Sequence, residues 1–545
     1  QYRAFGVPGL GFKRDLEQDL VIAPYATILA LPFARQEALQ ALREMEALGG
    51  RGEYGFYEAI DFTAERLPRG QRHMVVRSFM AHHQGMSLLA LANLLSPRKM
   101  YERFHHDKRV RAAELMLQER IPAQPRIIKH PALARVHLPY QEQAGTGPYR
   151  EFTTADTPAP EVCVLANGSL MTVVTTGGSG FSRWRGLAVS RWQEDPVLDN
   201  WGCYIYLRDV NRNTLWSPTY QPCRIPPAKQ RIQFSLDRAT FMREDGELKT
   251  TLEVCISPEW DAEIRRLTLA NAGSEPRIIE VTTYQEPVLA APLADELHPA
   301  FSKLFLETAF EEKTGCLLAH RRPRREEEQE IWAAHSLIAA ANTLGPAEYE
   351  TDRACFVGRG YTLARPRGIA ARLRGKTGSV ADPAFIMRRR IKIEPGEQVQ
   401  LFAVTAVGST KDDVLSIISH FTTDQAVERS FQMAWNRSQI ELRHLHLTGD
   451  EAIVFQVMAG RILYTPPFKE PRGKSIRHNV KGQSGLWAFG ISGDLPLVLV
   501  RIAHRAGLSF AIRLITGHEY LNRLGLAFDL VILNESAAGY RQDLQ

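Results

Sequence analysis

A single glutamate among aromatic side chains is the residue of this sequence best suited to chemistry. Glu58 lies in the segment YGFYEAIDF, and four aromatic residues surround it: Tyr54, Phe56, Tyr57 and Phe62. Aromatic faces can stack on sugar rings, and partial burial favours the protonated carboxyl group that a glycosidic general acid needs. Glu58 is therefore either such an acid or a structural carboxylate that pairs with an arginine, for example Arg72 or Arg77. Asp61 is a second carboxylate nearby, and at its position it could simply cap the next turn.

Two adjacent histidines, His82 and His83, lie shortly after this glutamate in an apolar segment. Neighbouring residues of a helix point in different directions, whereas a helical metal site needs ligands four residues apart. We therefore expect no metal here. One of the two histidines could face a cavity and bind a sugar hydroxyl group, and the alternative is a histidine whose hydrogen bonds are satisfied inside the core.

A second set of polar side chains lies near the end of the chain in RHNVKGQSGLWAFGISGDLP. This glycine-rich segment carries Arg477, Gln483, Trp487 and Asp494 between two expected helices. Polar side chains on such loops commonly line ligand pockets. We expect these four residues to bind substrate.

Three tryptophans are interleaved with charged residues in GGSGFSRWRGLAVSRWQEDPVLDNWGCYIYLRD. Such a pattern either binds carbohydrate or forms a seam between domains, and we prefer the seam. The glycines of this segment do not form a phosphate loop, because no helix or lysine follows them in the required way. The residues concerned are Trp184, Trp192 and Trp201 with Arg183, Arg185, Arg191, Asp195 and Asp199.

Helical periodicity dominates the first hundred residues. Apolar residues every three positions predict a helix over 35–48, which Gly49 and Gly50 end. A second helix is predicted over about 71–95, and its apolar residues on nearly every side indicate burial by neighbouring elements. A helix, a loop with functional residues and a buried helix are typical of an α/α toroid.

The middle of the chain changes to a period of two, as in Leu252, Val254 and Ile256. Many short strands with Gly, Asn and Pro turns predict a large antiparallel β-sandwich. Helices return after it, one of them preceded by Thr448 and others over about 495–507 and 518–525. The expected fold is multidomain α and β: a partial (α/α)6 toroid over 1–105, a linker over 106–150, the sandwich over 151–410, a helical connector over 411–450 and the start of a second (α/α)6 toroid over 451–545.

Composition narrows the functional classes. A chain of 545 residues is expected to form two or three domains. Its net charge of +6 is mild and no basic stripe with interleaved aromatics occurs, which argues against nucleic acid as a partner. The six cysteines contain no C-x-x-C pair, so no disulfide framework or zinc site is expected. No apolar run is long enough to span a membrane, and we expect a soluble piece of a longer protein.

Two groups of segments carry a resemblance to cyclic β-1,2-glucan synthases. The first group resembles their middle, glycoamylase-like region and comprises RAFGVPGLG, YGFYEAIDF and VVRSFMAHHQGMSLLAL. The second resembles their family 94 glycoside phosphorylase region and comprises SRWRGLAVSRWQEDPVLDNWGCYIYLRDV, HPAFSKLFLET, ETDRACFVGRG, GQSGLWAFGISGDLP and LAFDLVILNE. The resemblance covers nearly the whole chain in the same order.

The resemblance implies a role for each part. The family's enzymes lie at the cytoplasmic side of the bacterial inner membrane and carry a glycosyltransferase that uses UDP-glucose. Their middle domain closes β-1,2-glucan into a ring by transglycosylation, and their last domain resembles phosphorylases that use inorganic phosphate. Glu58 matches an acid of the middle domain, while Arg477, Gln483 and Asp494 match the wall of a sugar subsite.

The same resemblance implies that neither active site is complete within these residues. The partner of Glu58 is expected before Gln1, and the catalytic aspartate and phosphate-binding residues are expected after Gln545. No cofactor is expected in the chain itself, and its partners are β-1,2-glucan and the rest of the parent chain. The competing interpretation is a non-catalytic carbohydrate-binding or scaffolding module, and a free-standing phosphorylase is disfavoured by the preceding toroid.

Overall fold

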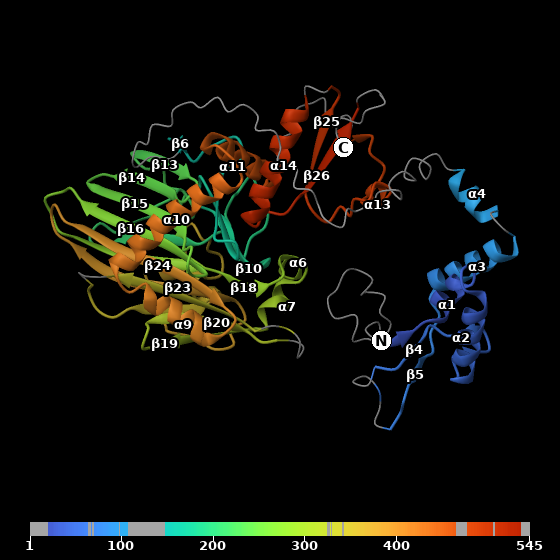
Figure 1. Ribbon diagram of the computed structural model, residues 1–545. Coiled ribbons are helices and arrows are strands. Elements are labelled where there is room, and N and C mark those ends of the chain that lie inside the picture. Colours follow the sequence, from blue (N-terminus) through green and yellow to red (C-terminus); the bar gives the residue numbers. More distant parts are fainter. Residues whose placement is uncertain are drawn as a thin grey trace. The chain divides into compact units, whose positions relative to one another are not determined.

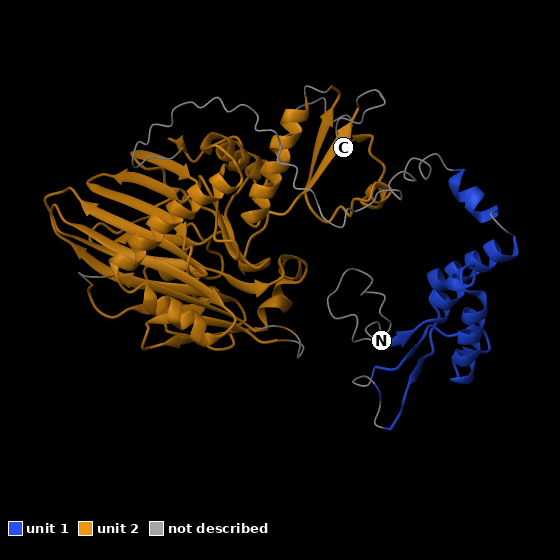
Figure 2. Ribbon diagram, in the orientation of Figure 1, with its two compact units in different colours: residues 1–140 blue, residues 141–545 orange. Residues whose placement is uncertain are grey.

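The chain folds as two compact units, residues 1–140 and 141–545 (Figure 2). The computed structural model describes residues 20–63, 67, 70–96, 99–106, 148–323, 328, 330–339, 343–464, 477–504 and 507–535. The RAFGVPGLG segment and nearly all of the expected linker over 106–150 lie outside the described residues.

The first unit combines helices with a small antiparallel sheet of order β1-β4-β5 (Figure 1). The helix predicted over 35–48 is confirmed as α2, which packs with α3 around α1. The elements are β1 Val21–Ile22, α1 Pro24–Ala30, α2 Arg35–Ala47, β2 Arg51–Gly52, β3 Gly55–Phe56, β4 Ala59–Asp61, β5 Met74–Val76, α3 Ala81–Leu95 and α4 Lys99–His105.

The helix predicted over about 71–95 is wrong in its first part. Residues 74–76 form β5, and Val75 and Val76 pair with Ile60 and Ala59 of β4. Their β-branched side chains suit a strand better than a helix. The expected burial of the helix is also wrong, because Leu88 is 67% exposed and other apolar residues of α3 are exposed with it.

The second unit is built on three antiparallel sheets, which confirms the predicted mixture of α structure with a large antiparallel β-sandwich. The nine-stranded sheet has the order β19-β20-β21-β24-β16-β15-β14-β13-β6, and the two five-stranded sheets have the orders β12-β11-β17-β23-β22 and β18-β10-β9-β8-β7. The nine-stranded sheet comprises β6 Tyr149–Phe152, β13 Lys229–Ser235, β14 Ala239–Asp245, β15 Leu248–Ile256, β16 Ala262–Asn271, β19 Leu306–Glu311, β20 Cys316–Arg321, β21 Ile331–Ala339 and β24 Gln398–Gly408. The other strands are β7 Val162–Ala166, β8 Leu170–Thr175, β9 Gly180–Trp184, β10 Leu187–Ser190, β11 Tyr204–Asp209, β12 Thr214–Trp216, β17 Arg277–Gln285, β18 Pro287–Ala290, β22 Glu348–Asp352 and β23 Pro383–Ile393.

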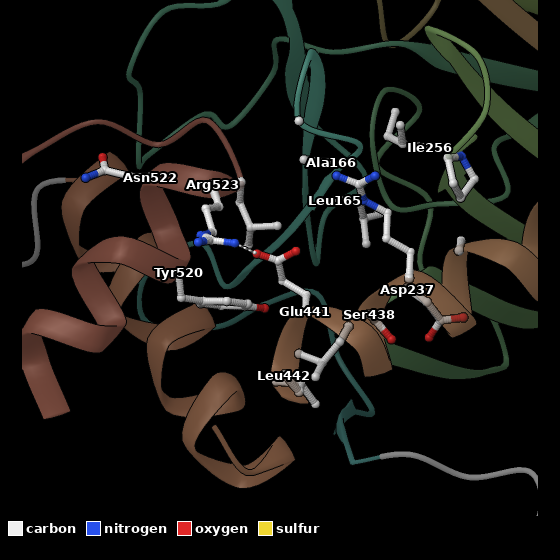
Figure 3. Close-up of a pocket in the computed structure, with 16 residues that line it drawn as sticks. Leu165, Ala166, Asp237, Ile256, Ser438, Glu441, Leu442, Tyr520, Asn522 and Arg523 are labelled. Atoms are coloured by element: carbon white, nitrogen blue, oxygen red, sulfur yellow. Dashed lines mark hydrogen bonds and ion pairs between the residues drawn. The ribbon is translucent and has the colours of Figure 1, made fainter. Parts of the chain in front are cut away.

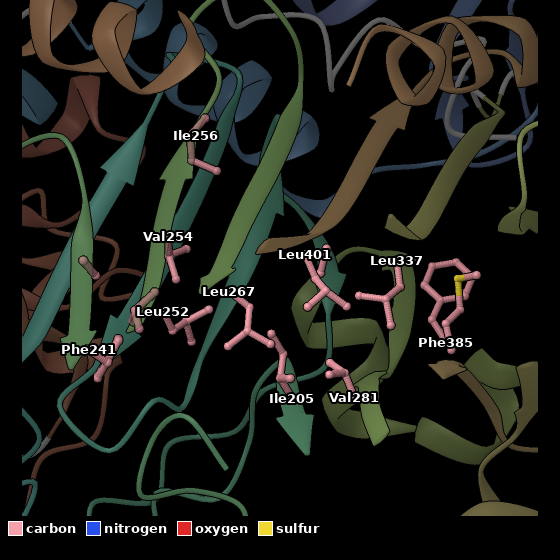
Figure 4. Close-up of a cluster of buried hydrophobic side chains, with 14 of the residues drawn as sticks. Ile205, Phe241, Leu252, Val254, Ile256, Leu267, Val281, Leu337, Phe385 and Leu401 are labelled. Atoms are coloured by element: carbon pink, nitrogen blue, oxygen red, sulfur yellow. The ribbon is translucent and has the colours of Figure 1, made fainter. Parts of the chain in front are cut away.

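Apolar side chains from all three sheets form the main core (Figure 4). The alternation of Leu252, Val254 and Ile256 turns these residues of β15 inward, where they meet Ile205 of β11 and other strands of the facing sheets. Burying such side chains is the main favourable term in folding. Short helices on the connections complete this part: α6 Pro292–Leu297, α7 Pro299–Lys303, α8 Arg353–Val357 and the 3₁₀ helix η6 Arg367–Ile369.

Helices α9 Lys411–His420 and α10 Asp424–His444 lie against the nine-stranded sheet (Figure 1). The side chain of Thr410 caps α9 and that of Thr423 caps α10. Helix α11 Gly449–Leu463 begins with a capping box between Thr448 and Glu451, so the predicted start is confirmed.

The last described segment holds α13 Ser484–Trp487, β25 Leu497–Ile502, α14 Leu508–Arg523 and β26 Asp529–Asn534. The helix predicted over about 495–507 is wrong, because residues 497–502 form a strand that pairs in parallel with β26. Two continuous apolar runs joined by a helix are typical of a parallel βαβ unit. No helix among the described residues is long and apolar enough to cross a membrane.

Candidate functional site

The first candidate site is a buried pair between Glu58 and His83. Glu58 follows β3, donates its backbone N–H to Val76 of β5 and points toward α3. Its Oε1 meets Nδ1 of His83, and both residues are almost fully buried, at 3% and 2% exposure. The expectation that an arginine pairs with Glu58 is wrong, because Arg72 and Arg77 are exposed and a histidine fills that role.

Neighbouring groups hold the imidazole in place. The ring of Tyr25 stacks on His83 with a centroid distance of 3.7 Å, and this contact had no signal in the sequence. The second carboxylate oxygen of Glu58, Oε2, is buried and has no hydrogen-bond partner among the described residues. A carboxyl–imidazole pair with one unused oxygen can hold or pass a proton.

The other predicted residues of this unit lie around the pair in different ways. His82 is exposed, so His83 is the histidine that reaches the carboxylate. Tyr57 is half-buried and packs on Phe79 at 5.3 Å, close over Gly52, whereas Tyr54 is 82% exposed. Asp61 is fully buried and accepts the backbone N–H of Thr63 at 2.9 Å, which is the turn role considered for it.

The second candidate site begins with the loop around α13. Gln483 donates to Asp494 at 2.9 Å and to the carbonyl of Ser492 at 3.0 Å, and Trp487 donates to the same carbonyl at 3.1 Å. Gly493 has φ +77° and lies against the Gln483 side chain, which lets the loop turn back tightly. Three of the four predicted residues therefore come together, and all three are exposed.

Arg477, the fourth predicted residue, is exposed at the start of the same described stretch. The part of the chain that the structure describes contains no hydrogen bond or ion pair between it and the other three. Its place in a sugar subsite stays a prediction.

Asp494 also lines a cavity of about 570 Å³ at the edge of the sandwich. The opposite wall comes from the sandwich, where the sequence pattern indicated a seam rather than a ligand pocket. Several of its residues can recognise a saccharide or an anion: Arg183, Arg185, Trp192 and Gln193. A volume of this size lies in the range of about 300–1,000 Å³ that is usual for small-molecule sites.

Arg183 is the cation best placed for a ligand in this cavity. It lies on β9, half-buried, with its guanidinium 4.6 Å from the ring centroid of Phe181. Burial lowers the pKa of Arg183, and the described residues offer it no ion pair. The sequence signal for this role was the SRWR pattern, in which alternate residues of one strand point to the same face.

Trp192 lines the cavity and also packs between the sandwich and the end of α11. This contact supports the preferred interpretation of the tryptophan segment as a seam. The ring of Trp192 packs on Phe181 at 4.7 Å and on Tyr464, the C-cap of α11, at 5.9 Å. The preceding Arg191 is buried and bonds both Asp295 and Glu286. This ion cluster fixes the loop that carries Trp192 and Gln193.

Helix α11 binds the sandwich directly through Gln456. Its amide accepts from the backbone N–H of Val164 at 2.8 Å and donates to the carbonyl of the same residue at 3.0 Å, as a neighbouring strand would. Nearby, Asp199 accepts hydrogen bonds from Thr175 and Tyr464, and burial raises the pKa of Asp199 to about 6.

Another cavity, of about 330 Å³, lies beside β7 between the sandwich and helices α10 and α14 (Figure 3). An ion pair between Arg523 and Glu441 at 3.2 Å bridges the two helices there. The cavity has an apolar wall that includes Leu165 and Leu442. In the described ranges, no group of three or more His, Cys, Asp or Glu side chains could hold a metal ion.

Comparison with known proteins finds relatives for both units of the chain. The family model "Glycosyl hydrolase 94, supersandwich domain" matches residues 147–424, and the glycoamylase family model matches residues 1–107. The cyclic β-(1,2)-glucan synthase NdvB of Rhizobium meliloti (strain 1021) is 37% identical over all of this chain, which covers 19% of that protein. The chain thus spans about a fifth of the length of this relative.

Two phosphorylases match a shorter part. The N,N'-diacetylchitobiose phosphorylase of Vibrio proteolyticus is 21% identical over 48% of this chain and 32% of that protein. The 3-O-β-D-glucopyranosyl-β-D-glucuronide phosphorylase of Paenibacillus borealis is 23% identical over 49% of this chain and 33% of that protein. The supersandwich match covers just over half of the chain, and the chain therefore belongs to glycosyl hydrolase family 94.

Proposed function

We propose that this chain is part of a cyclic β-1,2-glucan synthase and contributes to two reactions on that glucan. The observation that carries the proposal is the buried Glu58–His83 pair in a unit that matches glycoamylases, within a chain that is 37% identical to NdvB over its whole length. The first unit takes part in transglycosylation that closes the ring. The second takes part in phosphorolysis of chain ends.

In the first unit, Glu58 is the general acid. It donates a proton to the glycosidic oxygen as the bond to the leaving sugar breaks. His83 is a positioning residue, since its Nδ1 holds one carboxylate oxygen and leaves Oε2 for the substrate. Tyr54 and Tyr57 supply aromatic faces for the flanking sugar rings, and His82 lies at the exposed rim.

In the second unit, the 570 Å³ cavity receives the end of the glucan chain. Asp494, oriented by Gln483, accepts hydrogen bonds from sugar hydroxyl groups, and Trp487 and Arg477 extend that wall. Two relatives are phosphorylases by name, which supports inorganic phosphate as co-substrate. The reaction inverts the anomeric centre: phosphate attacks as the nucleophile while a carboxyl group elsewhere in the parent protonates the leaving oxygen.

The proposal extends to the parent protein. In the parent, two (α/α)6 toroids are completed around these units. The parent also carries a glycosyltransferase that uses UDP-glucose, and it lies at the cytoplasmic side of the bacterial inner membrane. The domains are those predicted from the sequence: a toroid part over 1–105, a linker over 106–150, the sandwich over 151–410, a connector over 411–450 and the start of the second toroid over 451–545.

Incubation of the 545-residue chain with linear β-1,2-glucan and phosphate tests the division of labour. We expect neither cyclic glucan nor glucose 1-phosphate, because each reaction needs carboxyl groups from outside these residues. A longer protein that contains both complete domains serves as the matched positive control and should form both products. Release of either product by the 545-residue chain alone would contradict the proposal. Glucan binding without activity in the longer protein would favour a scaffolding module instead.

A further inference from the structure

A third cavity, of about 410 Å³, opens on the sandwich next to the one that holds Asp494. It lies where the β7–β8 and β9–β10 turns meet the β15–β16 turn and the start of α9. Two tryptophans and several polar groups line it: Asn167, Ser169, Trp184, Arg185, Glu259 and Trp260. Of these residues, Ser169 and Arg185 also line the cavity of Asp494, and the others have no part in the reactions described above.

The two cavities share lining residues at the tip of one hairpin. Arg185 and Gly186 form the two-residue turn between β9 and β10, with φ of +48° and +83°. Positive φ at both positions is the geometry of a type I′ turn, which fits the twist of a hairpin. The turn holds the Arg185 guanidinium 4.6 Å from the ring centroid of Trp184, between the cavities. Ser169 also lines both.

One half-buried carboxylate, that of Asp261, ties together the turns that form the floor of the third cavity. Asp261 accepts from the indole N–H of Trp184 at 2.6 Å and from the amide of Asn167 at 3.1 Å, and it also bonds the Ser169 hydroxyl group. Asn167 reaches the backbone carbonyl of Trp260 at 3.0 Å as well. The turns that form the cavity are therefore fixed before any ligand arrives, which lowers the entropy cost of binding.

Groups that could contact a ligand stay free above this floor. Trp260 is half-buried, packs on His420 at 5.5 Å, and its indole N–H has no hydrogen-bond partner in the described part of the chain. Glu259 forms an ion pair with Arg429 through its Oε1 at 3.0 Å. The guanidinium of Arg185 contacts a ring face and has no ion pair among the described residues. An aromatic face beside donors and acceptors that can still form hydrogen bonds suits a sugar ring and its hydroxyl groups.

We propose that this cavity is a distal subsite that holds a glucose unit of a glucan chain whose end lies in the cavity of Asp494. The inference rests on the proposed function and adds the place where a long substrate continues along the sandwich. Trp260 stacks on the sugar, and Arg185 binds the linkage between the two cavities. Because the two sites act on one chain, the second contact raises affinity for long substrates only.

Binding measurements with the 545-residue chain test the subsite. The probes are linear β-1,2-glucan and the β-1,2-linked glucose disaccharide, with affinity read by isothermal titration calorimetry. Trp260→Ala should weaken the binding of long glucan about tenfold and leave the disaccharide unchanged. Trp260→Phe keeps an aromatic face and should recover most of the affinity. Trp435→Ala is the matched control, since Trp435 is 41% exposed on α10 and lines none of these cavities.

The outcomes separate the inference from the proposed function. Equal affinity of the Trp260→Ala variant and the wild type for long glucan overturns the subsite, as does an equal loss for long glucan and disaccharide. If the wild type binds no β-1,2-glucan of any length, both the subsite and the proposed function fail. If it instead binds a glucan of another linkage in a way that depends on Trp260, the saccharide subsite stands and the proposed function is overturned.

Discussion

Replacing His83 with alanine removes the imidazole that meets the buried carboxylate of Glu58. Both side chains are almost fully buried, and Oε2 of Glu58 already lacks a partner among the described residues. Removing one partner of a buried hydrogen bond and leaving the other group unsatisfied costs about 1–3 kcal/mol. A loss of that size is a large part of the total stability of about 5–15 kcal/mol that is usual for a domain. We therefore expect the variant to open the first unit.

The neighbouring His82 provides a matched control. It is exposed on the same helix and its ring packs on that of His83 with a centroid distance of 3.9 Å, so His82→Ala should cost about 1 kcal/mol or less. The variant Glu58→Gln replaces the carboxyl group with an amide and keeps the side-chain volume. In that background His83→Ala should cost about 1–3 kcal/mol less, because the two residues are coupled.

Amide hydrogen exchange read by mass spectrometry can follow the first unit alone. Peptides from β4 and α3 should lose protection in His83→Ala and keep it in His82→Ala. All eight tryptophans lie in the second unit, so the tryptophan fluorescence transition should stay unchanged and confirms that the rest of the chain is intact. Equal protection of α3 in the two histidine variants would refute the reasoning.

Three further changes concern the second unit. Burial lowers the pKa of His335 to about 4, so the free energy of unfolding falls as the pH drops below about 6.5 and the unfolded chain takes up the proton. Between pH 8 and pH 5, the free energy of unfolding of His335→Gln, measured with urea, should therefore fall by about 2 kcal/mol less than that of the wild type. His444→Gln, at an exposed histidine, is the control. Burial raises the pKa of Asp199 to about 6, which destabilises the folded state as the pH rises from 4 to 7. Asp199→Asn should therefore raise the free energy of unfolding by about 1–3 kcal/mol at pH 7 and leave it unchanged at pH 4. An equal increase at both pH values would contradict this pKa. Thr448→Ala removes the capping box of α11 and should lower the free energy of unfolding by about 1 kcal/mol, whereas an unchanged denaturation midpoint would mean that the cap contributes nothing.

Local signals made much of the fold predictable. Alternation in Leu252, Val254 and Ile256 depends only on the two faces of a strand, and threonine caps depend only on the first turn of a helix. The errors lie where tertiary pairing decided the outcome. Met74–Val76 and Leu497–Ile502 are short apolar runs that fit a helix or a strand, and pairing with β4 and β26 selected the strand.

The candidate sites were predictable to different degrees. The Gln483–Asp494 contact joins residues only eleven positions apart on one loop, so the sequence brought them together. The partner of Glu58 is 25 residues away on another element, and no spacing rule distinguishes His83 from Arg72 or Arg77 for that role. Arg183 faces Asp494 across a cavity formed by segments about 300 residues apart, which only the folded chain reveals.

The role of Glu58 is tested most directly in a longer protein that contains this chain together with both complete catalytic domains. Linear β-1,2-glucan is supplied with and without phosphate, and cyclic glucan and glucose 1-phosphate are measured for wild type and Glu58→Gln. The account predicts that cyclisation falls by at least about 10²-fold while glucose 1-phosphate is released at the wild-type rate. Undiminished cyclisation by the variant, or an equal loss of both products, would contradict it.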